Sequence, residues 1–342
     1  MHERFLPLLE CLGCREPLTI HAKERELGRV VEGHLACSKC AATYPIRRGI
    51  PRFVPPENYA GSFGFQWNKF PRVNLDSYNG TTLNRDTILR RTGWSPSHLS
   101  TKTIVECGCG AGCDTEVLAE LAQTLVSVDL SAAVDAIGPE VALRDNVLML
   151  QADLGRLPLR QAAFDVVYCH RVLQHTPDPE LYFHKMAPHV KAGGEFFVHI
   201  YDSHIRSLLA AKYWLRPLTR RMRPETVLRV LQTVGPSLYR MLGVLEPLRI
   251  RRLLKLLVPF KNHQSHLRTA GSRLSPEEEY NLSLLIALDA LTPAYDNPRS
   301  PKTVIGWFKA AGYKDCRVMQ RNPVCIIGRR PPAESIPQLR AA

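Results

Sequence analysis

No run of uncharged apolar residues in this sequence approaches the roughly 18 residues that a membrane-spanning helix needs. The first residues, MHERFLPLLECLGC, hold only a short apolar run, which is too short for a secretory signal. Without such a signal, the ten cysteines indicate a reducing compartment, where paired cysteines bind metal more often than they form disulfides. We therefore expect a cytoplasmic protein, with peripheral attachment to a membrane left open.

Acidic residues are scarce in one segment of the chain. Residues 203–275 hold 15 Lys and Arg but only two acids, Glu225 and Glu246. The net charge of this segment is therefore +13, which equals the net charge of the whole chain. The charge therefore describes one module and its partner rather than the fold. Leu and Val recur there at helical spacing, and prolines at 217, 224, 236, 247 and 259 are expected to divide the segment into short helices.

The chain shows no internal repeat and divides instead into distinct parts. Short β-branched apolar runs alternate with helical patterns, which predicts an α/β core with a mostly parallel sheet covered on both faces. The expected strands are 103–107, 124–130, 147–153, 164–172 and 194–201, followed by an antiparallel C-terminal hairpin of 315–321 and 324–330. The expected divisions are a cysteine-bearing unit at 1–56, a core at 57–202 plus 300–330, a basic helical insert or cap at 203–299 and a tail at 331–342.

Two cysteine pairs mark the first unit, Cys11-x2-Cys14 and Cys37-x2-Cys40, with 22 residues between them. This spacing predicts a tetrahedral Zn²⁺ site that folds a short segment lacking its own core. The adjoining CSKCAATYPIRRGIPRFV resembles a signature of the small zinc-ribbon proteins that activate tRNA and protein methyltransferases. A structural site of this kind has no open coordination position, so we expect no catalysis there. A ribbon packed without metal is the alternative.

The segment IVECGCGAGCD joins a predicted strand to a predicted helix. Gly108, Gly110 and Gly112 stand at alternate positions, whereas the dinucleotide fingerprint needs its third glycine where Cys113 stands. Acids mark three successive strands: Glu106 precedes the glycines, and Asp129 and Asp153 end the next two strands. A metal site of Cys107, Cys109 and Cys113 is disfavoured because no fourth ligand lies nearby in the sequence.

This E-x-G-x-G-x-G pattern resembles motif I of class I S-adenosylmethionine-dependent methyltransferases. The resemblance continues through VVYCHRVLQHTPDP and HKMAPHVKAGGEFFVHIY, and so covers about 100–202, with 300–330 matching more loosely. It implies a Rossmann-like seven-stranded sheet and S-adenosylmethionine as cofactor. The segment SFGFQWNKF at 62–70 either helps to cover the cofactor or packs as a strap on the sheet. The implied cofactor-binding residues are Glu106, Gly108, Cys109, Gly110, Gly112, Asp129, Leu130, Asp153, Leu154 and His170.

Methyl transfer demands mainly positioning and exclusion of water, because the methyl donor is already activated. A hydroxyl acceptor also needs a general base. The candidates are His175 after the fourth strand, His199 and Tyr201 at the end of the fifth, and Asp296 in the return loop. His175 is the first choice, although it can equally fix the turn QHTPDP, and His199 can be a satisfied core residue.

The partner of the basic insert stays open between four interpretations. It is a solvated helical cap, a site for an anionic substrate such as a nucleotide-linked sugar, a surface for anionic membranes, or an RNA-binding module. Aromatic residues for base stacking are few there: Tyr213, Trp214 and Tyr239.

The sequence therefore predicts an S-adenosylmethionine-dependent methyltransferase acting on a small-molecule, sugar or lipid-linked acceptor, most simply by O-methylation. The return segment LTPAYDNPRSPKTVIGWFKAAGY resembles that of bacterial small-molecule methyltransferases, which disfavours nucleic acid as the acceptor. The alternatives are an RNA methyltransferase that grips nucleic acid with ribbon and insert, and a non-catalytic methyltransferase-like partner protein.

Overall fold

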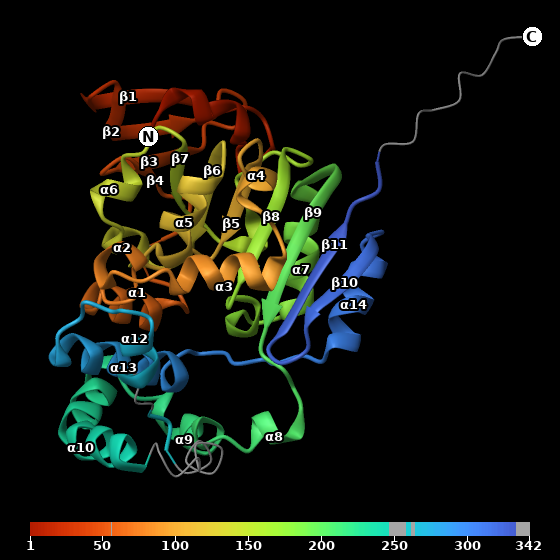
Figure 1. The fold of residues 1–342 in the computed structure, drawn as a ribbon. Coiled ribbons are helices and arrows are strands. Elements are labelled where there is room, and N and C mark those ends of the chain that lie inside the picture. Colours follow the sequence, from red (N-terminus) through yellow and green to blue (C-terminus); the bar gives the residue numbers. More distant parts are fainter. Residues whose placement is uncertain (56, 246–257, 261–263, 333–342) are drawn as a thin grey trace, which may run out of the picture.

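A seven-stranded sheet forms the centre of the computed structural model, which describes residues 1–55, 57–245, 258–260 and 264–332 (Figure 1). Its order is β10-β11-β9-β8-β5-β6-β7. Strands β5 to β9 pair in parallel, and the hairpin β10–β11 adds to β9 in antiparallel orientation, which confirms the predicted fold class. The bounds are β5 Thr103–Cys107, β6 Thr124–Asp129, β7 Val147–Gln151, β8 Phe164–His170, β9 Val190–Ile200, β10 Lys314–Gln320 and β11 Val324–Arg329.

Both faces of this sheet are buried, because alternate side chains of each strand enter different apolar clusters. In β5, Val105 packs with the helices α7 (Pro179–Met186) and α14 (Pro301–Ala310), whereas Ile104 packs on the other face. That other face is covered by α3 Leu83–Thr92, α4 Pro96–Leu99, α5 Cys113–Leu121 and α6 Pro139–Ala142. Continuous apolar strands are what a parallel sheet covered on both sides requires.

The strand order reverses at β5, which lies between β8 and β6. In open α/β sheets this reversal leaves a crevice beyond the carboxyl ends of the strands, where ligands bind. The short elements around the crevice are α1 Gly61–Lys69, α2 Asp76–Asn79, η2 Ala132–Ala136, η3 Leu154–Arg156 and η4 Leu173–His175, whereas η5 Ala187–His189 precedes β9 at the opposite ends of the strands.

A four-stranded antiparallel sheet, the ribbon, occupies the amino-terminal end of the chain. It follows the short helix η1 Glu3–Leu8 and consists of β1 Thr19–Glu26, β2 Arg29–Ala36, β3 Thr43–Arg47 and β4 Ile50–Pro51. Phe5, Leu9 and Phe53 of this part belong to the same apolar cluster as Leu157 and Leu159 of the core. The ribbon is therefore built into the core rather than tethered beside it.

The insert between β9 and α14 is helical and lies at the opposite end of the molecule from the ribbon (Figure 1). It comprises α8 Ile205–Leu208, α9 Ala211–Thr219, α10 Pro224–Leu245, α12 Gln264–Thr269 and α13 Pro276–Leu291. Helix α13 begins with a capping box formed by Ser275 and Glu278. Within the described ranges, no helix is both long and apolar enough to cross a bilayer.

One expectation for the insert is wrong. Pro236 does not divide the segment, because α10 continues through it as a helix of 22 residues. The residue before it, Gly235, has no Cβ to clash with the proline ring, which removes part of the usual cost of an internal proline. Pro217 likewise lies inside α9, and Pro247 lies outside the described residues.

Candidate functional site

A cleft of about 1150 Å³, part of it open solvent, lies at the carboxyl ends of β5, β6 and β8. It brings together most of the residues expected to bind the cofactor, and it also takes in His175. Five predicted residues are not part of its lining: Gly112, Asp153, His199, Tyr201 and Asp296. The predicted residues that line it are Glu106, Gly108, Cys109, Gly110, Asp129, Leu130, Leu154, His170 and His175.

The glycine loop needs glycine for two separate reasons. Gly108, Gly110 and Gly112 have φ values of 86°, 54° and 90°, a region that other residues rarely adopt. In addition, a Cβ at Gly108 would lie 2.2 Å from Cγ2 of Val172, and one at Gly110 would lie 3.0 Å from Nε1 of Trp67. Trp67 therefore packs directly against the glycine loop. Helix α1, which carries Trp67, lies against the cleft.

Asp129 ends β6 and is fixed by three donors. Its Oδ2 accepts the Gly110 N–H at 2.8 Å, and its Oδ1 accepts the Ser131 N–H at 2.8 Å and the Ser131 hydroxyl at 2.7 Å. Burial raises the pKa of Asp129, and these hydrogen bonds oppose the rise. The carboxylate is thus preoriented at the cleft wall beside the glycine loop.

Glu106 lies at the floor of the cleft and is almost fully buried. Its Oε2 accepts hydrogen bonds from the hydroxyls of Thr115 and Ser127, both at 2.7 Å. Burial and the neighbouring Asp114 raise the pKa of Glu106 to about 8. A buried acid that is costly to ionise alone is well suited to receive a cationic group.

Asp153 and Leu154 follow β7 but face different surroundings. Leu154 lines the cleft, whereas Asp153 caps η3 by accepting the Gly155 N–H at 2.8 Å. The Tyr182 hydroxyl also donates to Asp153 at 3.4 Å, and the Tyr59 hydroxyl donates to Tyr182 at 3.5 Å. This chain of contacts connects Asp153 to the cleft through Tyr59, which belongs to the lining.

His170 is one member of a buried polar chain that the sequence did not reveal as a whole. Arg91 donates to His170 Nε2 at 2.7 Å, so His170 is neutral and its Nδ1–H donates to Asp114 at 2.5 Å. Burial lowers the pKa of His170 to about 4, in agreement with the neutral ring. The Tyr168 hydroxyl also donates to Asp114, at 2.9 Å.

Arg171 is a cleft residue that sequence reasoning missed. Its φ of 65° is unusual for a residue with a side chain, and that side chain is exposed and lines the cleft. Its backbone N–H donates to Nδ1 of His199 at 3.1 Å, and within the described part of the chain its guanidinium makes no hydrogen bond. The sequence placed Arg171 inside the predicted strand 164–172, whereas β8 ends at His170.

His175 lines the cleft with one ring nitrogen committed and the other unused. Its Nδ1–H donates to the Tyr295 carbonyl at 3.0 Å, which fixes the tautomer and leaves Nε2 as an acceptor. Nε2 is buried and has no hydrogen-bond partner among the described residues. Burial lowers the pKa of His175, so the ring stays neutral, and Phe63 packs edge-on against it at 5.1 Å.

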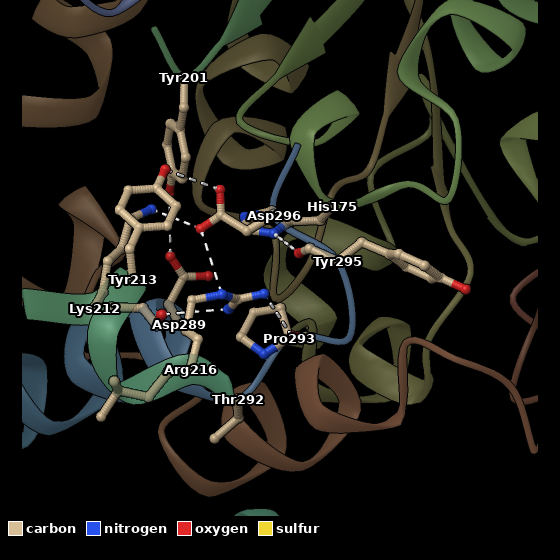
Figure 2. A network of polar contacts seen from close by, with 12 residues as sticks. His175, Tyr201, Lys212, Tyr213, Arg216, Asp289, Thr292, Pro293, Tyr295 and Asp296 are labelled. Atoms are coloured by element: carbon tan, nitrogen blue, oxygen red, sulfur yellow. Dashed lines mark hydrogen bonds and ion pairs between the residues drawn. The ribbon is translucent and has the colours of Figure 1, made fainter. Parts of the chain in front are cut away.

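The other base candidates are held in structural contacts, and Figure 2 shows those of Asp296 and Tyr201. Asp296 is buried and accepts from Lys212 at 2.6 Å and from the Tyr213 hydroxyl at 3.3 Å. His199 is occupied by the Arg171 backbone. The Tyr201 hydroxyl donates instead to Asp289 at 3.5 Å, and Asp289, which the sequence did not single out, lines the cleft.

The four ribbon cysteines converge on one point. Their sulfur atoms all lie within 4.8 Å of one another, with Cys14–Cys37 at 3.4 Å and Cys11–Cys40 at 3.5 Å. Zn–S bonds of about 2.3 Å in a tetrahedron place sulfurs about 3.8 Å apart, so the cluster fits Zn²⁺. Across the part of the chain that the structure describes, no other group of His, Cys, Asp and Glu is arranged in this way.

Comparison with known proteins adds the chemistry. Residues 105–198 match a family of methyltransferase domains. Ubiquinone biosynthesis O-methyltransferases from Cupriavidus pinatubonensis and Azotobacter vinelandii are each 29% identical, over 45% and 38% of this chain and 68% and 60% of their own. An S-adenosylmethionine-dependent methyltransferase structure from Mesorhizobium loti is 24% identical over 36% of this chain and 56% of its own, with a TM-score of 0.30, too low for inference. The family match and the curated relatives identify a class I S-adenosylmethionine-dependent methyltransferase domain.

Proposed function

We propose that this S-adenosylmethionine-dependent methyltransferase transfers its methyl group to a hydroxyl oxygen of a small or lipid-linked acceptor. The observation that carries the proposal is the buried Nε2 of His175, an unpaired proton acceptor at the wall of the cleft. The names of the curated relatives, O-methyltransferases, agree with an oxygen acceptor.

The cofactor supplies an activated methyl group, and side chains of this protein bind the other groups of the cofactor. We assign Asp129 to the ribose hydroxyls, since carboxylates at this strand end accept such hydrogen bonds. Glu106 is assigned to the ammonium. Arg171 is assigned to the carboxylate, because its guanidinium lines the same cleft without a partner among the described residues. Leu154 and Leu130 offer apolar contact to the adenine.

We assign His175 as the general base that accepts the proton of the acceptor hydroxyl. Its neutral ring accepts that proton at Nε2 while Nδ1–H stays bound to the Tyr295 carbonyl. Removal of the proton makes the acceptor oxygen a better nucleophile as it approaches the methyl carbon. Phe63, Leu285 and Ile286 line the same cleft and exclude water from the reacting atoms.

Cofactor binding and proton transfer can be tested separately. Titration calorimetry with S-adenosylhomocysteine should show an affinity loss of about 10- to 100-fold for Asp129→Asn, from the loss of a charged hydrogen-bond acceptor. His175→Asn should bind it normally but methylate a panel of phenols and alcohols ~10²–10⁴ times more slowly, measured as transfer of labelled methyl. His184→Asn, on α7 and outside the cleft lining, is the matched control. Normal transfer by His175→Asn would contradict the assignment.

An RNA acceptor is less well supported. Of the three aromatic residues in the first part of the insert, Tyr239 is buried and Tyr213 binds Asp296, so only Trp214 is exposed for stacking. The cleft also presents the carboxylate of Asp289, which a phosphate-bearing acceptor would meet unfavourably.

A further inference from the structure

The outer side of the helical insert carries an unusual concentration of exposed apolar side chains. Of 15 large apolar side chains that are exposed in the described residues, ten lie between residues 205 and 244. Such a concentration of exposed apolar side chains in one part of the chain indicates a site of interaction. We call these ten residues the outer face: Ile205, Leu208, Leu209, Trp214, Leu215, Leu218, Val230, Val234, Met241 and Val244.

Helix α10 presents two apolar stripes. Val230, Val234, Met241 and Val244 follow helical spacing and so share one exposed face, with Val244 76% exposed. The buried stripe, which includes Leu228 and Leu231, packs with the apolar residues of α13. The exposed stripe therefore points away from α13 and has no apolar partner in the described structure.

Helix α9 repeats this arrangement. Arg216 faces α13 and donates to the carbonyls of Ala290 and Pro293, at 3.4 and 2.9 Å (Figure 2). Trp214 and Leu218, one helical turn apart, are 71% and 66% exposed. Both α9 and α10 contact α13, and Figure 1 shows the two helices at the same end of the molecule, the end away from the ribbon.

Exposed arginines lie beside the outer face. Arg229 and Arg240 are exposed on α10 and lie along one side of its apolar stripe. The insert that carries the outer face is basic in composition, because its sequence between 203 and 275 holds 15 basic residues and two acidic ones. Exposed aliphatic and tryptophan side chains bordered by arginines are the chemistry of helices that lie in the interface of an anionic bilayer.

The outer face is also close to the chemistry of the cleft. Leu285, Ile286 and Asp289 of α13 line the cleft, while Leu282 and Leu285 pack in the same cluster as the buried stripe of α10. One helix thus separates the exposed apolar surface from the acceptor side of the site.

We propose that the outer face docks on the surface of a lipid bilayer rich in anionic headgroups. Trp214, Leu218 and the α10 stripe enter the boundary between headgroups and acyl chains, and the arginines stay with the phosphates. If the protein docks in this way, its methyl acceptor is located in the membrane. Only this inference about the acceptor rests on the proposed function.

The test uses the full chain and vesicles, without cofactor or acceptor, so its outcome is independent of methyl transfer. The protein should sediment with vesicles of equal parts phosphatidylcholine and phosphatidylglycerol. It should stay in solution with phosphatidylcholine alone or at high salt. Trp214→Ser/Leu218→Ser and Val230→Ser/Val234→Ser should each weaken binding at least about tenfold, because each removes two apolar side chains that would be buried in the bilayer on docking. Arg229→Gln should weaken it about fivefold.

Two exposed leucines elsewhere provide matched controls. Leu27, 94% exposed on the ribbon, and Leu143, 51% exposed beside α6, each lose an exposed apolar side chain when changed to serine and should leave vesicle binding unchanged. Equal binding by the outer-face variants and the wild type would overturn the proposal. So would self-association in the absence of vesicles that the outer-face variants abolish, because the face would then pair with a second copy of the chain.

Discussion

The ribbon and the insert are both additions to one sheet, but they are attached in opposite ways. The ribbon shares an apolar cluster with the sheet, and just after the ribbon the backbone N–H of Phe53 donates to the carbonyl of Gln151 in β7. The insert has a cluster of its own, in which α10 and α13 pack with each other and with Phe70 and Val73. An addition that completes the core stabilises it, whereas one with its own core is free to expose an apolar surface.

Two arginines show the same contrast at the level of single bonds. Arg15 extends from the ribbon to the core, where it donates to the carbonyls of Leu157 and Leu159 at 2.9 and 2.8 Å. Arg216 binds carbonyls that belong to the end of α13 and the loop after it. Arg15 thus connects the ribbon to the core, whereas Arg216 connects two parts of the insert.

The largest expected effect comes from the cysteine cluster. Cys37→Ser should abolish bound zinc and lower the free energy of unfolding of the whole protein by on the order of 5 kcal/mol, because the ribbon shares the core cluster. Metal analysis and thermal unfolding measure the two effects. Cys316→Ser, in β10 and outside the cluster, is the control and should change neither. A Cys37→Ser protein of normal stability would mean that the ribbon packs without metal.

The two arginines offer a sharper test of the contrast. Arg216→Met should cost about 2–3 kcal/mol, since it removes bonds from a charged donor to buried carbonyls and leaves Asp296 with Lys212 alone as an ionic partner. Arg15→Met should cost about 1 kcal/mol, because its side chain is partly exposed. Urea unfolding gives both values. Vesicle binding should fall for Arg216→Met only, and a loss in Arg15→Met would erase the distinction between the two additions.

The last prediction concerns acid. Burial lowers the pKa of His170 and of His189 to about 4, below the 6.5 of an unfolded histidine. Between those values the unfolded chain binds protons that the folded core refuses, so stability is lost as the pH falls from about 6.5 to 4. The slope is about 1.4 kcal/mol per pH unit for each such histidine. Unfolding by urea at a series of pH values should show this slope, and His189→Gln should reduce it. His189 donates to the carbonyl of Arg160, and the backbone N–H of Arg160 donates to the carbonyl of Leu8 in the amino-terminal segment. This variant therefore tests acid sensitivity beside the ribbon.

Much of the sheet was predictable because each strand is a short apolar run between turn signals. The strand at 103–107 matches the structure, and that at 124–130 is one residue too long. The fifth strand begins earlier than predicted, at Val190, so Gly193 lies within β9 instead of before it. The glycines still mark an irregularity, because the pairing with β8 passes directly from Val190 to Glu195 and the pairing with β11 covers only Glu195–Ile200.

The cleft was predictable only in part. Glycines and strand-end acids have fixed positions relative to their strands, so Glu106 and Asp129 could be placed. The direction of His199 and Asp296 depends on packing with distant segments, which no local pattern contains. Arg171 was missed because nothing in the sequence shows that its backbone adopts a positive φ and turns the side chain toward the cleft.

The carboxyl of Glu106 has a consequence for how the cleft fills. Because its pKa is near 8, a substantial share of molecules carry a proton there at neutral pH. In the proposed assignment, the ammonium of the cofactor favours the ionised form of Glu106 and displaces that proton. Cofactor binding is then coupled to proton release, and its affinity should vary with pH in the range where Glu106 titrates.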